Sequence, residues 1–197
     1  MRHGQTDWNV ERRIQGQLNS QLTDYGREQA RSLGARLRGE HFDRYYSSTS
    51  DRAKETAQLV FPEADVELDE RLRELSYGVL EGKTYAEFSP EEREMRDWVS
   101  KDPFGRAVPK GETWNDLMLR VATWIGTLPK TGRVVAVTHG GTIRAAVYAL
   151  TARPRAYEWN LSFGNTGVTR LRITDDSHIV LGLNDTAHLE PLNRVES

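Results

Sequence analysis

No cysteine occurs anywhere in the sequence, which excludes disulfide bonds, thiolate metal sites and a thiol nucleophile. No apolar run approaches the length that spans a membrane, and the start of the chain lacks the apolar stretch of a signal peptide. Basic residues are not in excess either. The formal net charge is −2, so the composition indicates neither a nucleic-acid partner nor an anionic membrane. These absences predict a soluble protein of the cytoplasm.

What is present is typical of an ordinary globular chain. Its 197 residues, of which 37% are hydrophobic and 28% charged, are enough to bury a substantial core in one domain. No internal repeat, linker or low-complexity segment interrupts it. We therefore predict a single domain over residues 1–197.

Helical and strand patterns alternate along the chain. Apolar spacing of three to four residues and capping signals predict helices over 23–38, 53–60, 90–99, 114–128 and 140–150. Short apolar or aromatic segments predict strands over 42–48, 65–68, 133–138, 167–173 and 178–183. The polar, aromatic-containing stretch at about 83–110 is interpreted as an insertion. The alternation favours an α/β sandwich whose central strands have helices on both faces.

One predicted buried strand runs directly into a histidine and two glycines. The apolar run Val134–Val137 is followed by Thr138, His139 and Gly140–Gly141. Ligands of open α/β sheets gather at the carboxyl ends of strands. An imidazole there lies beside backbone N–H groups at a helix start, which favour anions. The alternative is that the glycines only make a turn and that His139 is a polar cap.

A second strand end carries an arginine. Ser47–Ser50 form a hydroxyl-rich turn whose last residues can cap the next helix, and Arg52 falls in the first turn of that helix. A cation is unfavourable there unless it shares an anion with the helix dipole. Alternatively, Arg52 is a surface residue paired with Asp51 or Glu55, and such pairs are common.

The segment Leu72–Gly82 places acidic residues among apolar ones and glycines. A carboxylate in partly apolar surroundings can have its pKa raised enough to donate a proton. The alternative is a solvated loop acid, which is the usual position of glutamate. Composition does not distinguish Glu74 from Glu81 as the proton donor.

Arg2, His3 and Gly4 open the chain, and a tripeptide of this kind is a weak signal alone. The tripeptide becomes informative together with the later motifs, because histidines, arginines and an acid all fall at or beside predicted strand ends. Together they supply a nucleophile, a phosphate clamp and a proton donor.

In their order along the chain, these motifs resemble those of the histidine phosphatase superfamily, which has the phosphoglycerate mutase-like fold. The matching segments cover nearly the whole chain: Arg2–Thr6 with Trp8 and Asn9, Arg12–Gly16, Leu22–Gly26, Ser47 and Ser48 with Arg52 and Ala53, Arg73 and Glu74 with Gly78, Glu81 and Gly82, Gly111–Thr113, and Thr138–Gly141. The resemblance implies a three-layer α/β/α sandwich with a mostly parallel central sheet.

The resemblance also implies a covalent mechanism. His3 is similar to the nucleophile that takes the phosphoryl group, and Glu74 to the acid that protonates the leaving oxygen and then activates water. A cationic phosphate pocket is implied at Arg2, Arg52 and His139, and neutral donors at Asn9, Gln15 and the backbone N–H of Gly140. Such groups imply phosphoryl transfer with no metal and no other cofactor.

The catalytic residues do not separate a phosphatase, which passes the phosphoryl group to water, from a mutase, which returns it to another hydroxyl. The short insertion and the tail Gly182–Leu189 resemble the phosphatase branch. We therefore expect hydrolysis of a small phosphorylated metabolite, with cofactor-dependent phosphoglycerate mutase activity as the alternative. A non-catalytic member that binds phosphorylated ligands or a partner protein would lack a core residue, and none is missing. The oligomeric state stays open.

The insertion is expected to act as a lid that contacts the rest of the ester. Tyr85, Phe88, Trp98 and Phe104 are candidates for an apolar wall around the substrate. Alternatively, they pack the insertion onto the domain.

In the family, the N-terminal signature follows a central strand of apolar residues, whereas Met1 alone precedes Arg2 here. A sheet without that strand would leave the nucleophile on a frayed terminus, without the positioning that catalysis needs. We therefore expect a few more apolar residues before Arg2 in the natural protein.

Overall fold

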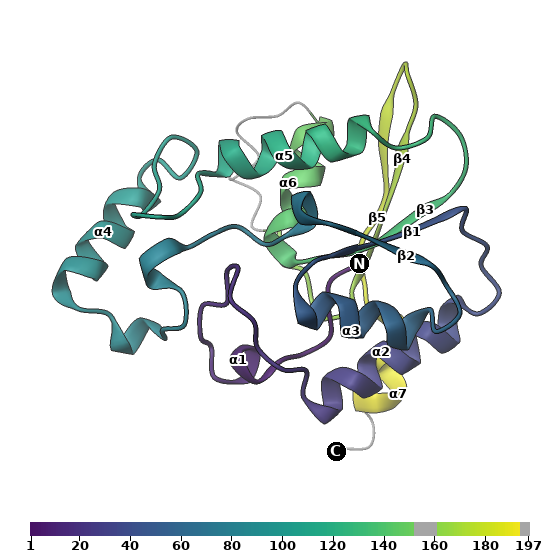
Figure 1. Ribbon diagram of the computed structural model, residues 1–197, viewed down its shortest axis with the longest axis horizontal. Coiled ribbons are helices and arrows are strands. Elements are labelled where there is room, and N and C mark those ends of the chain that lie inside the picture. Colours follow the sequence, from purple (N-terminus) through teal and green to yellow (C-terminus); the bar gives the residue numbers. More distant parts are fainter. Residues whose placement is uncertain (152–160, 194–197) are drawn as a thin grey trace.

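The computed structural model describes residues 1–151 and 161–193. Its helices are α1 (Asp7–Val10), α2 (Asp24–Leu37), α3 (Asp51–Val60), α4 (Pro90–Ser100), α5 (Trp114–Gly126), α6 (Gly140–Thr151) and α7 (Glu190–Asn193). Its strands are β1 (Arg44–Ser48), β2 (Val66–Asp69), β3 (Val134–Val137), β4 (Val168–Ile173) and β5 (His178–Asp185). Figure 1 shows α5 and α6 on one side of the strands and α2 and α3 on the other, so the predicted α/β sandwich is confirmed.

The strands form a parallel sheet and an antiparallel ribbon. β1 lies between β2 and β3 and is parallel to both, while β4 pairs with β5 in antiparallel fashion. The chain start joins the two, because Arg2 forms a parallel bridge with Thr138 just beyond β3. On its other side, the Arg2 N–H donates to the Gly167 carbonyl beside β4 at 3.2 Å.

Met1 is buried and hydrogen-bonded along the β3 side. Its amine donates to the Ala136 carbonyl at 2.7 Å, and the Thr138 N–H donates to the Met1 carbonyl at 2.8 Å. Burial lowers the pKa of the amine to about 5. The terminus is therefore anchored rather than frayed. A groove of about 850 Å³ lies beside Met1, lined by residues of β3, β4, α5 and α6. The expectation of further apolar residues before Arg2 stays a prediction.

Two apolar clusters pack the helices, and the first of them covers one face of the sheet. One consists of Ala30, Leu33, Leu37, Ala53, Ala57 and Val60 against Val135 and Val137. The other consists of Leu117, Val121, Ala145 and Leu75. The apolar run of β3 is not buried on both faces as predicted. Val134 and Ala136 are only half-buried, because their side chains line the groove beside Met1 instead of meeting a packed layer.

Helix α2 fixes the loop that follows His3. Thr23 caps the helix as predicted by accepting from the Gly26 N–H at 2.9 Å, and the Thr23 N–H donates to the Gln5 carbonyl at 3.0 Å. A Cβ at Gly26 would lie 2.0 Å from the Gln5 carbonyl oxygen, so only glycine allows this approach. The first turn of α2 therefore packs directly on the loop.

The insertion has its own small core. Phe88 is buried with Leu80 and Val108, which confirms the packing interpretation for this residue. Tyr85 and Trp98 are about half exposed, at 54% and 49%. In Figure 1, α4 lies at the end of the molecule away from β4 and β5.

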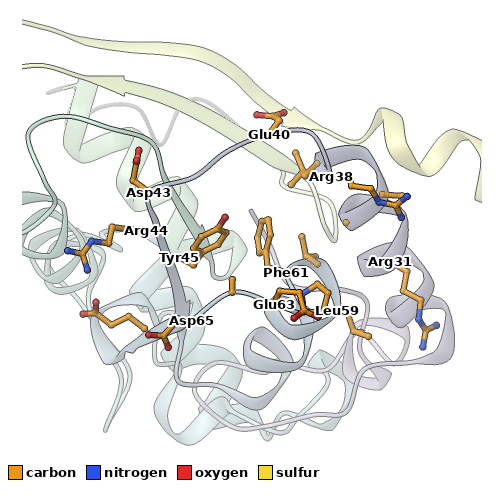
Figure 2. Close-up of a pocket in the computed structure, with 17 residues that line it drawn as sticks. Arg31, Arg38, Glu40, Asp43, Arg44, Tyr45, Leu59, Phe61, Glu63 and Asp65 are labelled. Carbon is orange, nitrogen blue, oxygen red and sulfur yellow. The ribbon is translucent and has the colours of Figure 1, made fainter.

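A pocket of about 820 Å³ opens at the amino end of β1, between α2 and α3 (Figure 2). Arg31, Arg38 and Arg44 lie around it together with Glu63 and Asp65. The polar residues predicted for the site follow the carboxyl ends of the parallel strands instead. This pocket is therefore not part of the candidate site.

Candidate active site

Three strand ends bring the predicted histidines and arginines together. His3 stands at the chain start beside β3, Arg52 lies in the first turn of α3 after β1, and His139 links β3 to α6. The His3 and His139 rings are 5.2 Å apart, centroid to centroid. His3, Arg52 and His139 are all buried, with exposures of 3%, 1% and 0%. Residues that are far apart in sequence thus form one buried polar cluster.

The hydrogen bond at His3 determines which ring nitrogen is free. Nδ1 lies 2.7 Å from the Gly4 carbonyl oxygen, which can only accept, so Nδ1 carries the proton. Burial lowers the pKa of His3 well below its ordinary value, and the charges of Arg2 and Arg52 lower it further. The ring is therefore neutral near pH 7, and the lone pair of Nε2 is available as a nucleophile.

Two arginines supply positive charge to this cluster. Arg52 donates from Nη1 to the Leu18 carbonyl at 2.6 Å and from Nη2 to the Gly16 carbonyl at 2.7 Å. Arg2 donates from Nη1 to the Phe163 carbonyl at 2.6 Å. Burial lowers the pKa of Arg52 to about 10, so it stays charged near pH 7. Within the described ranges, the Nε atoms of both arginines are buried without a hydrogen-bond partner.

His139 is held at one nitrogen and open at the other. Its Nε2 lies 2.9 Å from the Ser48 Oγ, and its buried Nδ1 has no partner among the residues that the structure describes. Burial, followed by the charge of Arg52, lowers the pKa of His139 well below its ordinary value. The lowered pKa favours the neutral imidazole near pH 7, and the place of His139 in the cationic pocket, which the resemblance implies, stays a prediction. The positive charge comes from the arginines.

Glu74 and Glu81 differ in position. The Glu74 Oε2 accepts from the Gly141 N–H at 3.0 Å, and its charge raises the pKa values of Arg2 and Arg52 against the larger effect of burial. The Glu81 Oε1 accepts from the N–H groups of Gln17 and Tyr77 and ties two loops together. Glu74 thus contacts the start of α6 and its charge acts on both arginines, while Glu81 braces loops and acts more weakly on Arg52. The acid role of Glu74 stays a prediction.

The three predicted neutral donors, Asn9, Gln15 and Gly140, lie in different parts of the structure. The Asn9 Oδ1 accepts from the Thr6 N–H in a capping box at α1. The Gln15 Oε1 accepts from the Ser20 hydroxyl at 3.0 Å. Gly140 begins α6, and a Cβ there would be 3.8 Å from the Arg2 side chain. Of these three residues, Gly140 therefore lies directly beside the Arg2 side chain.

The family model of the histidine phosphatase superfamily (branch 1) matches residues 1–186. The chain belongs to this superfamily. YhfR of Bacillus stearothermophilus is similar in structure, with 34% sequence identity, a TM-score of 0.86 and 96% of both chains covered. The phosphoserine phosphatase of Entamoeba histolytica, in complex with 3-phosphoglyceric acid, has 30% identity and a TM-score of 0.82 over 95% of this chain and 96% of that one. The probable phosphoglycerate mutase GpmB of Yersinia pestis is 31% identical over 200 residues, 96% of this chain and 93% of that protein.

Several groups that position the superfamily site were not singled out from the sequence. The Thr56 Oγ1 accepts from the Gly4 N–H at 3.0 Å, and the Asn165 Nδ2 donates to the His3 carbonyl at 3.1 Å. The position of Thr56 four residues after Arg52 on one helix is a signal that could have been used. Asn165 has no such signal, because it meets His3 only through the fold.

Two further observations concern metal-binding side chains and the length of the helices. The described residues contain no group of three or more histidine, aspartate or glutamate side chains that could hold a metal ion. In the same ranges, no helix has the length and hydropathy needed to cross a membrane.

Folding stability is expected to fall as the pH is lowered from 7.5 to 5.5. The unfolded chain has histidine pKa values near 6.5, whereas burial holds those of His3 and His139 well below this value and that of His188 at about 4. The unfolded chain therefore binds more protons in this window, which favours unfolding. The Met1 amine, with its pKa lowered to about 5, acts in the same direction. Urea unfolding at the two pH values measures the difference. The variant His139→Asn should have a smaller pH dependence, and equal stability of the wild type at both values would contradict the prediction.

Proposed function

We propose that this protein is a phosphatase that hydrolyses small phosphomonoesters through a phosphohistidine at His3, without a metal ion. The observation that carries the proposal is the state of His3. Its Nδ1 donates to the Gly4 carbonyl and its ring is neutral, so Nε2 offers a lone pair inside a buried cluster with two arginines. Membership of the histidine phosphatase superfamily supports this role.

The proposed reaction has two transfers. In the first, His3 Nε2 attacks phosphorus, the bond from phosphorus to the ester oxygen breaks, and Glu74 gives its proton to that oxygen. In the second, Glu74 takes a proton from water as the water oxygen attacks phosphorus, and the nitrogen–phosphorus bond breaks. Inorganic phosphate leaves, and His3 and Glu74 return to their starting states.

Arg2 and Arg52 provide the charge that this chemistry needs. Phosphoryl transfer depends mainly on in-line positioning and on stabilising the charge of the phosphoryl oxygens. The unpartnered, buried Nε donors of both arginines and the open Nδ1 of His139 are suited to phosphate oxygens. His139 would act as a neutral donor or become protonated once the phosphate dianion is bound.

The substrate class is proposed as a small phosphorylated metabolite. The Entamoeba histolytica relative is named a phosphoserine phosphatase and was solved with 3-phosphoglyceric acid, which favours a compact, carboxylate-bearing ester. The insertion at about 83–110 is proposed as the lid over the ester. Phosphoglycerate mutase activity is the second candidate, because the probable mutase GpmB matches over 93% of its own length and chain length does not separate the two.

A screen of phosphate esters in excess chelator tests the proposal. Phosphoserine, 3-phosphoglycerate, glycerol phosphate and para-nitrophenyl phosphate are each scored for free phosphate and, with 3-phosphoglycerate, for its isomer. We expect phosphate release that the chelator does not reduce. Isomer formation without phosphate release would favour the mutase. Activity that appears only with a divalent metal would overturn the proposal. A protein that binds vanadate, used as a phosphate analogue, but turns over none of the esters would overturn it too.

A further inference from the structure

The acid-bearing loop has little regular structure of its own. Glu74 lies between two short 3₁₀ turns, Glu70–Leu72 and Gly78–Leu80, rather than within a helix or strand. A general acid has to reach the leaving oxygen within hydrogen-bond distance, so its backbone must be fixed by other contacts. The Gly141 N–H holds only the carboxylate end of the side chain.

Arg120, on α5, contacts the backbone of this loop at three carbonyls, those of Arg71, Arg73 and Glu74. Its Nη1 donates to the carbonyl oxygens of Arg71 at 2.8 Å and Arg73 at 2.7 Å. Its Nη2 donates to the carbonyl oxygen of Glu74 itself at 2.9 Å. One guanidinium therefore sets the path of the chain on both sides of the acid.

Glu112 holds Arg120 in this orientation. The carboxylate accepts from Arg120 Nε at 2.8 Å and from Nη2 at 2.9 Å, a two-point contact. Together with the carbonyl contacts, these bonds use every one of the five N–H donors of the guanidinium. Glu112 also accepts from the Ser76 N–H at 2.9 Å, two residues beyond the acid. Both side chains are mostly shielded, with exposures of 18% and 23%.

We propose that Arg120, oriented by Glu112, is a positioning residue that sets the acid Glu74 for proton transfer. The proposal rests on the proposed phosphatase function and adds to it a group that does not touch the substrate. A lysine could not replace Arg120, because an ammonium group cannot reproduce the planar fork that reaches the carbonyls and Glu112 together.

The leaving group of the ester distinguishes this role from a merely structural one. In the first transfer, an alkyl phosphate needs its leaving oxygen protonated, whereas para-nitrophenyl phosphate does not, so only the alkyl ester depends there on a well-placed acid. The second transfer uses Glu74 as a base with both esters, so the comparison is made on kcat/KM, which reports the first transfer. We therefore expect Arg120→Met to lower kcat/KM for the best alkyl ester of the screen by about tenfold or more. The kcat/KM for para-nitrophenyl phosphate should fall by less than about threefold.

A cycle with Glu74→Gln tests whether Arg120 acts through the acid. In the Glu74→Gln background, Arg120→Met should cause no further loss with the alkyl ester. Glu112→Gln, which keeps the size of the side chain, should show the same selectivity more weakly. It replaces Arg120→Met as the test if that variant does not fold. Arg27→Met is the matched control, because it breaks an arginine–glutamate pair with Glu55 between α2 and α3, and it should leave the ratio of the two esters unchanged.

The outcomes separate this proposal from the proposed function. If Glu74→Gln is selective for the alkyl ester but Arg120→Met and Glu112→Gln slow both esters equally, the positioning role is overturned and the phosphatase stands. If Glu74→Gln itself lowers kcat/KM for both esters equally, the acid role fails and the positioning role fails with it. Additive losses in the cycle would also overturn the proposal, since Arg120 would then act independently of Glu74.

Discussion

The variant His3→Ala is expected to lower kcat for phosphate-ester hydrolysis by about a thousandfold or more, with every ester tested. The substitution removes the only atom proposed to bond to phosphorus, so no leaving group can restore the reaction. This makes the expected loss different from that of an acid variant, which an activated ester would rescue. Steady-state phosphate release in excess chelator gives the comparison.

His3→Asn is the matched variant for this experiment. An asparagine amide can donate to the Gly4 carbonyl in place of Nδ1 and so keeps the contact that the buried ring makes at 2.7 Å. It has no nucleophilic nitrogen, because the amide lone pair is delocalised. Both variants should be equally inactive. Base-quenched wild-type enzyme should retain label from a phosphorus-labelled substrate, whereas neither variant should. Substantial turnover by either variant would contradict a phosphohistidine at His3.

The sequence predicted the strand ends of the site because these ends carry local signals. Each of these signals lies within a few consecutive residues. One is the apolar run that leads into His139 and two glycines, and the other is the group of hydroxyl residues before Arg52. The structure places both at the carboxyl edge of one parallel sheet, as the α/β alternation requires. The neutral state of His139 was not predictable in this way, since it follows from complete burial beside arginines.

Contacts to backbone carbonyls were beyond sequence reasoning. Arg120 reads as one polar residue on an amphipathic helix, and nothing in its neighbours indicates that its guanidinium meets three carbonyls of a loop 46 to 49 residues away. Composition left Glu74 and Glu81 equivalent for the same reason, and only the resemblance assigned the acid role to Glu74. Both lie in one short segment, and only the fold shows that the charge of Glu74 acts on Arg2 as well as on Arg52.

The chain start was difficult to assess for a different physical reason. Three residues are too few for any periodicity, so Met1–His3 could be assessed only by what precedes them. In the structure they take their hydrogen bonds from both sides, from Ala136 and Thr138 near β3 and from Gly167 near β4. Backbone pairing of this kind depends on neighbours that are more than a hundred residues distant.

The variant Glu74→Gln is expected to lower kcat for alkyl phosphates by about 10² to 10⁴, the usual contribution of a general acid. Glu74 accepts from the N–H groups of Gly141 at 3.0 Å and Leu75 at 2.8 Å, and the single carbonyl oxygen of glutamine can keep the contact with Gly141 while the proton is lost. The first transfer with para-nitrophenyl phosphate needs no acid, so that ester should show a burst of nitrophenol near the wild-type rate.

Glu81→Gln is the matched control, since it changes a neighbouring carboxylate that braces the loop through Gln17 and Tyr77 instead of facing the arginines. It should weaken folding and slow both esters to a similar extent, without a burst. Rapid-mixing measurements on the two variants with the two esters therefore separate chemistry from loop placement. Selectivity for the alkyl ester in Glu81→Gln, with equal slowing in Glu74→Gln, would reverse the assignment. In that case, the Glu81 carboxylate would have to leave the N–H groups of Gln17 and Tyr77 to reach the substrate.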